Sequence, residues 1–273
     1  MTHPAILVTL GVFVGMVGSA IGVGGGFVVV PFLLIATSMI HPQAVATSLV
    51  VVVVTAAVGT AGFLRLGRLD RQTSFAFAAA SVPGAVGGAL VTLEVSGDVF
   101  RLLLGGVLLL AAVGLLITPR GEADRPRNLR SGWGILERTY ATLGGETVPY
   151  RVNLRWGVVV SLGVGAIGGF FGIGGGVLYV PFMFLALGVP FRMAVPISTA
   201  VLLPQSAVAL GVLALRGTMP QMPAVWLGAG ALVGAVVGVS MTRRVTGYAL
   251  RRVMAAVLAG VGAMMGLKYF GVL

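Results

Sequence analysis

Runs of apolar residues occupy most of this chain, and polar residues are concentrated in the segments between them. The runs are apolar on every side instead of alternating between apolar and polar, which favours helices in lipid over the strands of a membrane barrel. A spanning helix needs about 20 such residues, and some of these runs are shorter. The predicted helical segments are 5–20, 27–39, 43–63, 74–93, 99–118, 156–170, 177–188, 194–215, 222–241 and 248–267. We therefore expect an all-α integral membrane protein.

The composition supports lipid as the main solvent of this protein. Hydrophobic residues make up 58% of the chain and charged residues 9%, and the mean hydropathy is +1.06. A soluble domain carries about 25% charged residues, so this chain has too few to cover a water-facing surface. No Lys or Arg precedes the first apolar run, so we expect that run to be retained and not cleaved as a signal peptide.

The two halves of the chain repeat each other with a constant offset of 150 positions, as in 172 − 22. The segment Ile21–Gly26 matches Phe171–Gly176, and Ala44–Ser48 matches Ala194–Ser198. Each half has five apolar runs, of which the first two are short and joined by glycines. That pair forms either two crossings or one re-entrant hairpin, and both alternatives give an odd number of crossings. We therefore predict two inverted repeats, a pattern typical of transporters, at residues 1–118 and 154–273, joined by a linker at 119–153.

Basic residues are distributed unequally between the two predicted faces. One face receives 15 of the 18 Lys and Arg residues: Arg65, Arg68, Arg71, Arg120, Arg125, Arg127, Arg130, Arg138, Arg151, Arg155, Arg192, Arg243, Arg244, Arg251 and Arg252. The other receives Arg101, Arg216 and Lys268. Basic residues stay on the cytoplasmic side, so we expect a multi-pass cytoplasmic-membrane protein with both termini outside. The net charge of +11 then indicates anionic lipid headgroups as partners and no nucleic acid.

The linker contains one amphipathic pattern. Trp133, Leu136, Tyr140 and Leu143 recur at helical spacing, which predicts a short helix lying on the membrane surface. A plain linker is the alternative.

The paired glycine runs are the first candidate for chemistry. Consecutive glycines adopt backbone angles that other residues avoid, so their N–H groups can form a nest for an anion. The helix that follows each run adds free N–H groups and a positive dipole end. These candidate residues are Gly24, Gly25, Gly26, Gly174, Gly175 and Gly176. Close helix packing is the alternative function of glycine in membrane helices, and we assign Gly84, Gly88, Gly234 and Gly238 to it.

Hydroxyl and amide side chains near the glycine runs are the second candidate. Ser48, Ser198, Thr199 and Gln205 lie in the apolar runs that follow, with Thr47 and Thr55 close by. They are able to hydrogen-bond an oxyanion without carrying charge. The alternative is that Ser and Thr bond their own helix backbone. His41, beside Pro42, is expected to be a solvated loop residue.

Residue types that are missing from the apolar runs exclude other functions. Their interiors contain no Asp or Glu, which disfavours a proton-relay or cation carrier. The sequence has no His/Cys cluster, no paired carboxylates and no nucleophile beside a base, which disfavours an enzyme. It has no phosphate-binding loop of the G-x-x-x-x-G-K-[ST] type. We expect no cofactor and no metal site.

With these motifs the chain resembles the sulfite exporter TauE/SafE family. Ile21–Gly26 with Pro31, repeated as Phe171–Gly176 with Pro181, carries the resemblance, and the segments ending at Ser48 and Ser198 are similar to a second motif. The resemblance implies a bacterial- or archaeal-type permease for sulfite, sulfonates or related organosulfur anions. The second half has Thr199 after its serine, whereas the first has Thr47 before it, so the hydroxyl positions are shifted.

Our leading hypothesis is export of a small sulfur-containing anion by alternating access between the repeats. A non-transporting membrane partner or assembly protein is the alternative from another class, and a carrier of another small solute or a metal ion is a third. The sequence does not define the oligomeric state.

Overall fold

The structure is a computed structural model, and it describes residues 3–117, 135–141, 147–187, 189–242 and 247–269. The first half of the chain forms α1 (Pro4–Ile21), α2 (Gly26–Ala36), α3 (His41–Arg65), α4 (Arg71–Glu94) and α5 (Gly97–Ile117). The second half forms α6 (Leu154–Phe171), α7 (Gly176–Leu185), α8 (Phe191–Leu215), α9 (Pro223–Met241) and α10 (Gly247–Tyr269). Strands β1 (Ile135–Ala141) and β2 (Thr147–Asn153) lie between the halves. Every predicted apolar run falls on one helix, which confirms the helical membrane part of the expected fold.

The helices differ in length as the apolar runs do. Seven helices in the described part of the chain are long and apolar enough to cross a bilayer: α1, α3, α4, α5, α6, α8 and α9. By contrast, α2 has 11 residues and α7 has 10. At 1.5 Å per residue these two reach about 15–17 Å, roughly half the hydrocarbon thickness of about 30 Å.

Identifiable residues start and stop these helices. The Asp70 carboxylate caps α4 by accepting from the backbone N–H of Thr73 at 3.1 Å, and Asn153 caps α6 by accepting from the Trp156 N–H at 3.2 Å. Gly22 and Gly172 end α1 and α6 in the left-handed conformation, with φ of 80° and 69°. These caps satisfy helix-end backbone groups that would otherwise be left unpaired.

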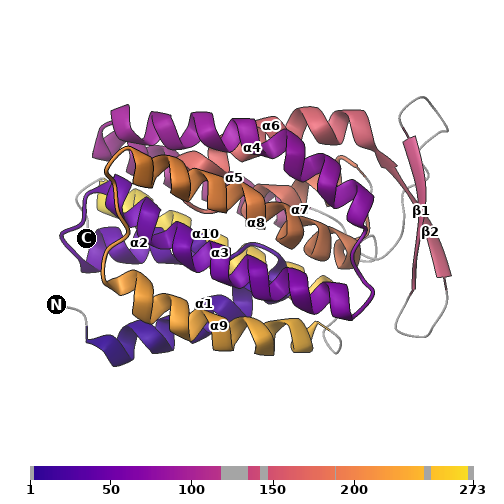
Figure 1. Ribbon diagram of the computed structural model, residues 1–273, viewed down its shortest axis with the longest axis horizontal. Helices are drawn as coiled ribbons and strands as arrows, with labels where there is room; N and C mark the ends of the chain where they lie inside the picture. Colours follow the sequence, from indigo (N-terminus) through magenta and orange to yellow (C-terminus); the bar gives the residue numbers. More distant parts are fainter. Residues whose placement is uncertain (1–2, 118–134, 142–146, 188, 243–246, 270–273) are drawn as a thin grey trace.

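The halves interlock instead of folding side by side. Helix α1 packs against α9 of the other half, and α6 packs against α4. Helix α3 packs against α8 at the centre of the bundle, and α5 packs against α10. Figure 1 shows α1 and α9 together along one side and α4 and α6 along the other. The contacts follow the repeat. The pair α1 and α9 corresponds to the pair α6 and α4, and the pairs α3–α8 and α5–α10 each join matching helices of the two halves.

Glycines set the closest of these helix contacts. A Cβ on Gly84 or Gly88 would lie 2.0 Å from the Leu162 carbonyl oxygen or 1.9 Å from the Ala166 carbonyl oxygen of α6. The matching positions Gly234 and Gly238 would meet the carbonyl oxygens of Val12 and Met16 of α1 at 2.0 and 2.2 Å. The prediction that these four glycines serve helix packing is confirmed.

The expectation of a surface helix in the linker is wrong. Leu136 and Tyr140 lie in β1, which pairs antiparallel with β2, so this part of the chain is a β-hairpin and the protein is not wholly α-helical. Trp133 and Leu143 lie outside the described residues. The decisive pattern is the alternation in β2, where Tyr150 and Val152 are buried, Pro149 before them is exposed and Arg151 between them is only partly buried; a period of two is typical of strands.

The hairpin is attached to one end of the helix bundle. The Tyr150 hydroxyl donates to Asp70 Oδ2 at 3.0 Å, and Asp70 belongs to the turn between α3 and α4. The hairpin projects from the end of the bundle opposite to the one where α1 begins (Figure 1).

His41 is not a solvated loop residue, as the sequence suggested. It begins α3 and is half-buried. Its Nε2 lies 2.9 Å from the Thr92 carbonyl oxygen at the end of α4, and its ring lies 5.0 Å from that of Phe100. The Phe100 ring is itself 5.3 Å from that of Phe171, so His41 packs at the edge of an aromatic cluster.

Large apolar side chains cover the outer surface of the helices. They are exposed on α1, α4, α5, α6 and α9: Ile6, Phe13, Phe75, Leu102, Leu103, Leu110, Leu116, Val159, Leu162, Leu232, Val233 and Val236. Phe75 is 76% exposed and Leu110 74%. So much exposed apolar area is typical of a surface that faces lipid.

Candidate functional site

The two glycine runs form two short loops with matching backbone geometry. The first loop is Gly22–Gly26 between α1 and α2, and the second is Gly172–Gly176 between α6 and α7. In each, the first, third and fourth residues are glycines with positive φ, between 69° and 83°. Side-chain-bearing residues rarely adopt such angles, so these loop shapes require glycine at those positions.

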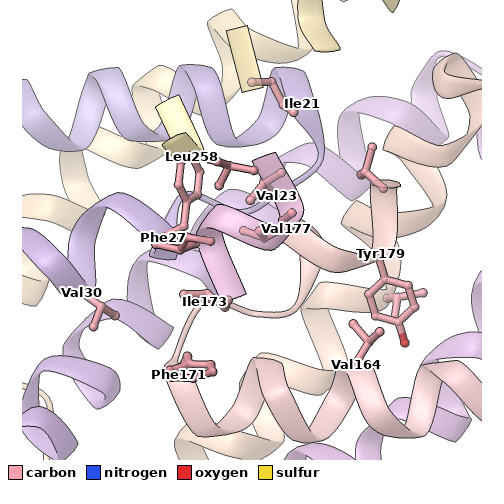
Figure 2. Packing of buried hydrophobic residues seen from close by; sticks show 14 of the residues in the cluster. Ile21, Val23, Phe27, Val30, Val164, Phe171, Ile173, Val177, Tyr179 and Leu258 are labelled. Atoms are coloured by element: carbon pink, nitrogen blue, oxygen red, sulfur yellow. The ribbon is translucent and has the colours of Figure 1, made fainter. Parts of the chain in front are cut away.

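The two loops contact each other in the interior, and all their residues are buried. A Cβ on Gly26 would lie 2.6 Å from the Gly172 carbonyl oxygen, and a Cβ on Gly176 would lie 2.6 Å from the Gly22 carbonyl oxygen. Figure 2 shows Val23 beside Val177 and Ile173 near Phe27. Each loop therefore rests on the start of the helix that follows the other loop.

Each loop is hydrogen-bonded by one serine from the opposite half of the chain. Ser48 Oγ, on α3, donates to the Gly172 carbonyl oxygen at 3.0 Å. Ser198 Oγ, on α8, donates to the Gly22 carbonyl oxygen at 2.6 Å. The sequence analysis paired these two serines with the glycine runs, and the structure brings them together in this crossed arrangement.

Each loop is also held by a side chain from its own half. Thr55 Oγ1 donates to the Gly24 carbonyl oxygen at 2.8 Å, and Gln205 Nε2 donates to the Gly174 carbonyl oxygen at 2.6 Å. Thr55 and Gln205 occupy matching positions in the repeats, since 205 − 55 is 150. The loop carbonyl groups are thus turned toward α3 and α8.

The loops retain unused hydrogen-bond donors. Within the described residues, the backbone N–H groups of Gly25, Gly26 and Phe27 make no hydrogen bond, whereas the N–H of Val28 donates to Gly25 O at 3.1 Å. The N–H groups of the matching residues 175–177 are also unpaired, again within the described part of the chain. Such groups at a helix start carry positive potential and bind anions readily.

Thr199 and Thr47 have other partners. Thr199 Oγ1 donates to the Val195 carbonyl oxygen of its own helix at 2.8 Å, which is the backbone alternative stated for such residues. Thr47 Oγ1 accepts from the Gln221 N–H at 3.0 Å, outside the glycine loops. Of the polar candidates from the sequence, Ser48, Thr55, Ser198 and Gln205 contact the glycine loops. Thr47 and Thr199 do not.

An apolar pair that the sequence did not single out contacts both loops. Val52 and Leu202 are fully buried on α3 and α8, and they occupy matching positions in the repeats. The added Cβ of Gly174 would lie 2.7 Å from Val52 Cγ1 and 2.8 Å from Leu202 Cδ2. Both side chains also approach Gly24. Only the constant offset between repeats, applied to apolar residues as well as polar ones, would have indicated them.

A cavity lies near the hairpin end of the bundle. It has a volume of about 770 Å³ and lies between α3 and α9, with Arg65 and Ser240 among its lining residues. It is also lined by Val58 of α3 and by the exposed side chains of Val236, Val237 and Met241 of α9. The cavity therefore opens at the outer surface of the bundle beside a basic residue.

The polar interior is uncharged in the described part of the chain. The buried polar residues there are Ser19, Thr47, Ser48, Thr55, Thr73, Ser74, Ser81, Thr92, Ser161, Ser198, Thr199, Gln205, Ser206 and Thr242. Among the described residues no group of His, Cys, Asp and Glu side chains has the geometry to hold a metal ion. Hydrogen-bond donors without a fixed charge suit reversible binding of a small polar solute or anion.

The crossed serine bonds give a testable expectation. Replacing Ser198 by alanine leaves the buried Gly22 carbonyl oxygen without its donor and should lower the free energy of unfolding by about 1–3 kcal/mol. Ser48→Ala should act similarly at Gly172. Thermal unfolding of the purified protein in detergent measures both effects. Ser240→Ala is the control, since this exposed hydroxyl bonds only its own helix, and it should change stability by at most about 0.5 kcal/mol. Equal stability of all three variants would contradict the crossed arrangement.

An apolar exterior, helices of spanning length and a buried uncharged polar centre define a multi-pass membrane protein. Comparison with known proteins assigns the family: the sequence pattern of the family described as "Sulfite exporter TauE/SafE" matches residues 7–265, and this chain belongs to that family.

Its relatives carry transporter names. The chain is 31% identical over 267 residues to a Bacillus subtilis protein called "Probable membrane transporter protein YunE", covering 95% of this chain and 96% of that protein. It is 34% identical over 194 residues to a "Probable membrane transporter protein" of Xylella fastidiosa, covering 70% of this chain and 67% of that protein. No solved structure matches the chain. The protein is a membrane transporter and not an enzyme.

Proposed function

We propose that this transporter carries a small sulfur-containing anion, such as sulfite or an organosulfonate, out of the cell by alternating access between two inverted repeats. The observation that carries the proposal is the meeting of the two glycine loops, each held by a serine of the other half. A solute that binds where the halves meet is able to change how they fit together. The family description supports the choice of a sulfur anion.

The half-length helices support a re-entrant arrangement. Helix α2 is too short to cross a bilayer, and its loop meets the loop of the opposite half in the interior. We infer that α1–α2 and α6–α7 are re-entrant hairpins that approach from opposite faces. Residues 1–118 and 154–273 then form the inverted repeats, and residues 119–153 form the linker that contains the hairpin.

The distribution of basic residues supports an orientation. Arg65 and Arg68 lie at the end of α3, and Arg68 and Arg71 line a pocket together with Tyr150 of the hairpin. Because basic segments stay inside, the hairpin end faces the cytoplasm in this proposal and both termini lie outside. Anionic headgroups of the inner leaflet are then the lipid partners, and the cavity beside Arg65 opens toward the cytoplasm.

The proposed binding step uses the donors already gathered at the loops. The anion contacts the unpaired N–H groups of Gly25, Gly26, Gly175 and Gly176, and Gly24 and Gly174 shape the loops around it. It also competes with the loop carbonyl groups for the hydroxyls of Ser48 and Ser198, and it accepts from the second N–H of the Gln205 amide, which Gly174 does not use. Losing the serine bonds frees each loop from the opposite half, which couples binding to relative movement of the repeats. Thr199, which packs against Gly59 of α3, completes the proposed set of binding residues.

The membrane potential supports export. An inside-negative potential of 100 mV is worth about 2.3 kcal/mol for each charge that crosses. An anion therefore leaves the cell downhill, and a dianion does so with about twice that drive. No coupled ion is required.

Ligand-dependent thermal stability of the purified protein tests the proposal. A ligand that binds only the folded state stabilises it by about 2.7 kcal/mol at a concentration of 100 times its Kd. We expect the melting temperature to rise with sulfite, thiosulfate or a small sulfonate, and to rise less with chloride. No rise with any sulfur anion at millimolar concentration would contradict the proposal and favour another solute or a non-transporting partner.

A further inference from the structure

Two buried polar atoms beside the second glycine loop have no hydrogen-bond partner among the described residues. They are Gln205 Oε1 and Ser206 Oγ, on consecutive residues of α8, and both residues are fully buried. A buried polar atom without a partner is unfavourable. Ser74 Oγ and Arg101 Nε share this state, but they lie at the starts of α4 and α5, away from the loops. The adjacent pair on α8 therefore requires an explanation at the site itself.

The orientation of the Gln205 amide is fixed by the loop. Its Nε2 donates to the Gly174 carbonyl oxygen at 2.6 Å, so its Oε1 is the atom left without a partner. Ser206 Oγ faces the same glycine, since a Cβ on Gly174 would lie 3.1 Å from it. An amide oxygen accepts hydrogen bonds and cannot donate them. The second loop thus has an unused acceptor beside a hydroxyl.

The first repeat has no such acceptor. Its matching residues are Thr55 and Ala56. Thr55 Oγ1 donates to the Gly24 carbonyl oxygen at 2.8 Å and lies 2.9 Å from the Val51 carbonyl oxygen, and Ala56 carries no polar atom. A threonine is therefore sufficient to hold a glycine loop. The glutamine and serine add hydrogen-bonding capacity that the loop itself does not use.

We propose that Gln205 Oε1 and Ser206 Oγ bind an O–H or N–H group of the transported solute. This inference rests on the proposed function and specifies its substrate as an anion that carries a hydrogen-bond donor, for example a hydroxyl, an ammonium group or an acidic proton. A fully deprotonated oxyanion would place a negative oxygen against the amide oxygen and leave it unpaired. The two side chains beside the second loop therefore select a solute with a hydrogen-bond donor, while the N–H groups of both loops bind its anionic oxygens.

The test compares two sulfonates of nearly equal size in the full-length protein in detergent. The probes are 2-hydroxyethanesulfonate, which carries a hydroxyl, and 1-propanesulfonate, which has a methyl group in its place. We expect the hydroxylated anion to bind about tenfold more tightly or better, because the analogue leaves buried polar atoms unpaired. Equal affinities would overturn the inference while leaving the transport of sulfur anions intact.

Matched variants assign the preference to the second repeat. Gln205→Met and Thr55→Val each remove a side-chain bond to a loop carbonyl, but only the first removes the unused acceptor. We expect Gln205→Met to lower the preference to about twofold or less and Thr55→Val to retain it. A preference that survives in Gln205→Met would overturn the assignment.

Ser206→Ala provides a second variant that breaks no hydrogen bond of the folded protein, so it should fold normally. It should reduce the preference for the hydroxylated sulfonate at least about threefold. An unchanged preference would remove Ser206 from the site.

A second pair of probes separates this inference from the proposed function. Glycolate and propionate differ in the same way but contain no sulfur. Suppose that the sulfonates and sulfite fail to bind while glycolate binds about tenfold more tightly than propionate. The site for a hydrogen-bond donor at Gln205 and Ser206 is then supported, and the proposal of a sulfur-containing substrate is contradicted. If none of these probes binds, both are overturned.

Discussion

Replacing Gly176 by alanine is expected to lower transport by more than about tenfold while leaving the protein folded. The Cβ of the new side chain would lie 2.6 Å from the Gly22 carbonyl oxygen and 2.6 Å from the Val23 Cα. Both atoms belong to the backbone of the opposite loop, so a rotamer change cannot relieve the contact. Overpacking of this kind costs about 1–3 kcal/mol, which shifts an equilibrium between two arrangements by about 5–150-fold. Gly176 has no positive φ, so alanine introduces no backbone strain of its own.

Flux in reconstituted vesicles, corrected for the amount of inserted protein, measures this effect. Gly26→Ala is the matching variant, since its Cβ would lie 2.6 Å from the Gly172 carbonyl oxygen. Gly87→Ala is the control, because a Cβ there has no neighbour within 4 Å. If Gly176→Ala transports as well as Gly87→Ala, the contact between the loops has no part in transport.

Replacing Gly88 by valine is expected to prevent the bundle from assembling. A Cβ at this position would lie 1.9 Å from the Ala166 carbonyl oxygen and 2.8 Å from the Phe170 backbone nitrogen. Helices α4 and α6 would have to separate along a seam that depends on small residues. We expect a loss of more than about 3 kcal/mol, the upper range for overpacked sites, with little folded protein recovered.

Size-exclusion profiles and thermal unfolding of the detergent-solubilised protein test this expectation. Gly87→Val is again the control, since it adds the same side chain to the same helix on an open side. A Gly88→Val protein as stable as Gly87→Val would show that the helices do not pack as closely as described.

The helices could be predicted from the sequence because each apolar run between polar segments has only one favourable structure in lipid. The hairpin could not be found in the same way. Leu136 and Tyr140 fit a helical spacing, and the described alternation of buried and more exposed residues in β2 extends only from Pro149 to Asn153. Tertiary contacts decide such short segments, here the bond between Tyr150 and Asp70.

Part of the site could also be predicted, because the constant offset between repeats marked Ser48 and Ser198 together with the glycines. The offset did not show that each serine bonds the opposite loop, since that requires the interlocking of the halves. Val52 and Leu202 went unnoticed because valine and leucine occur throughout the chain. Ser206 stands out only when the structure shows that its hydroxyl is buried without a partner.

The two crossed serine bonds limit how far one repeat can move relative to the other. When the halves are exchanged, the bond from Ser48 to Gly172 becomes the bond from Ser198 to Gly22. Breaking one bond therefore leaves an equivalent one in place, so the loops are released fully only when both serines are engaged elsewhere. In the proposed cycle the bound anion supplies that alternative partner.

Efflux of sulfite from vesicles that contain only the purified protein is the most direct test of the central claim. Vesicles of phosphatidylethanolamine and phosphatidylglycerol are loaded with sulfite, and a potassium gradient with valinomycin sets the potential. We expect protein-dependent efflux that rises as the inside becomes more negative and that is lost in Gly176→Ala. An efflux rate that does not change with the membrane potential would contradict uncoupled export and indicate electroneutral coupling to another ion. Absence of protein-dependent efflux of sulfite at every potential would contradict the assignment of sulfite as a transported anion.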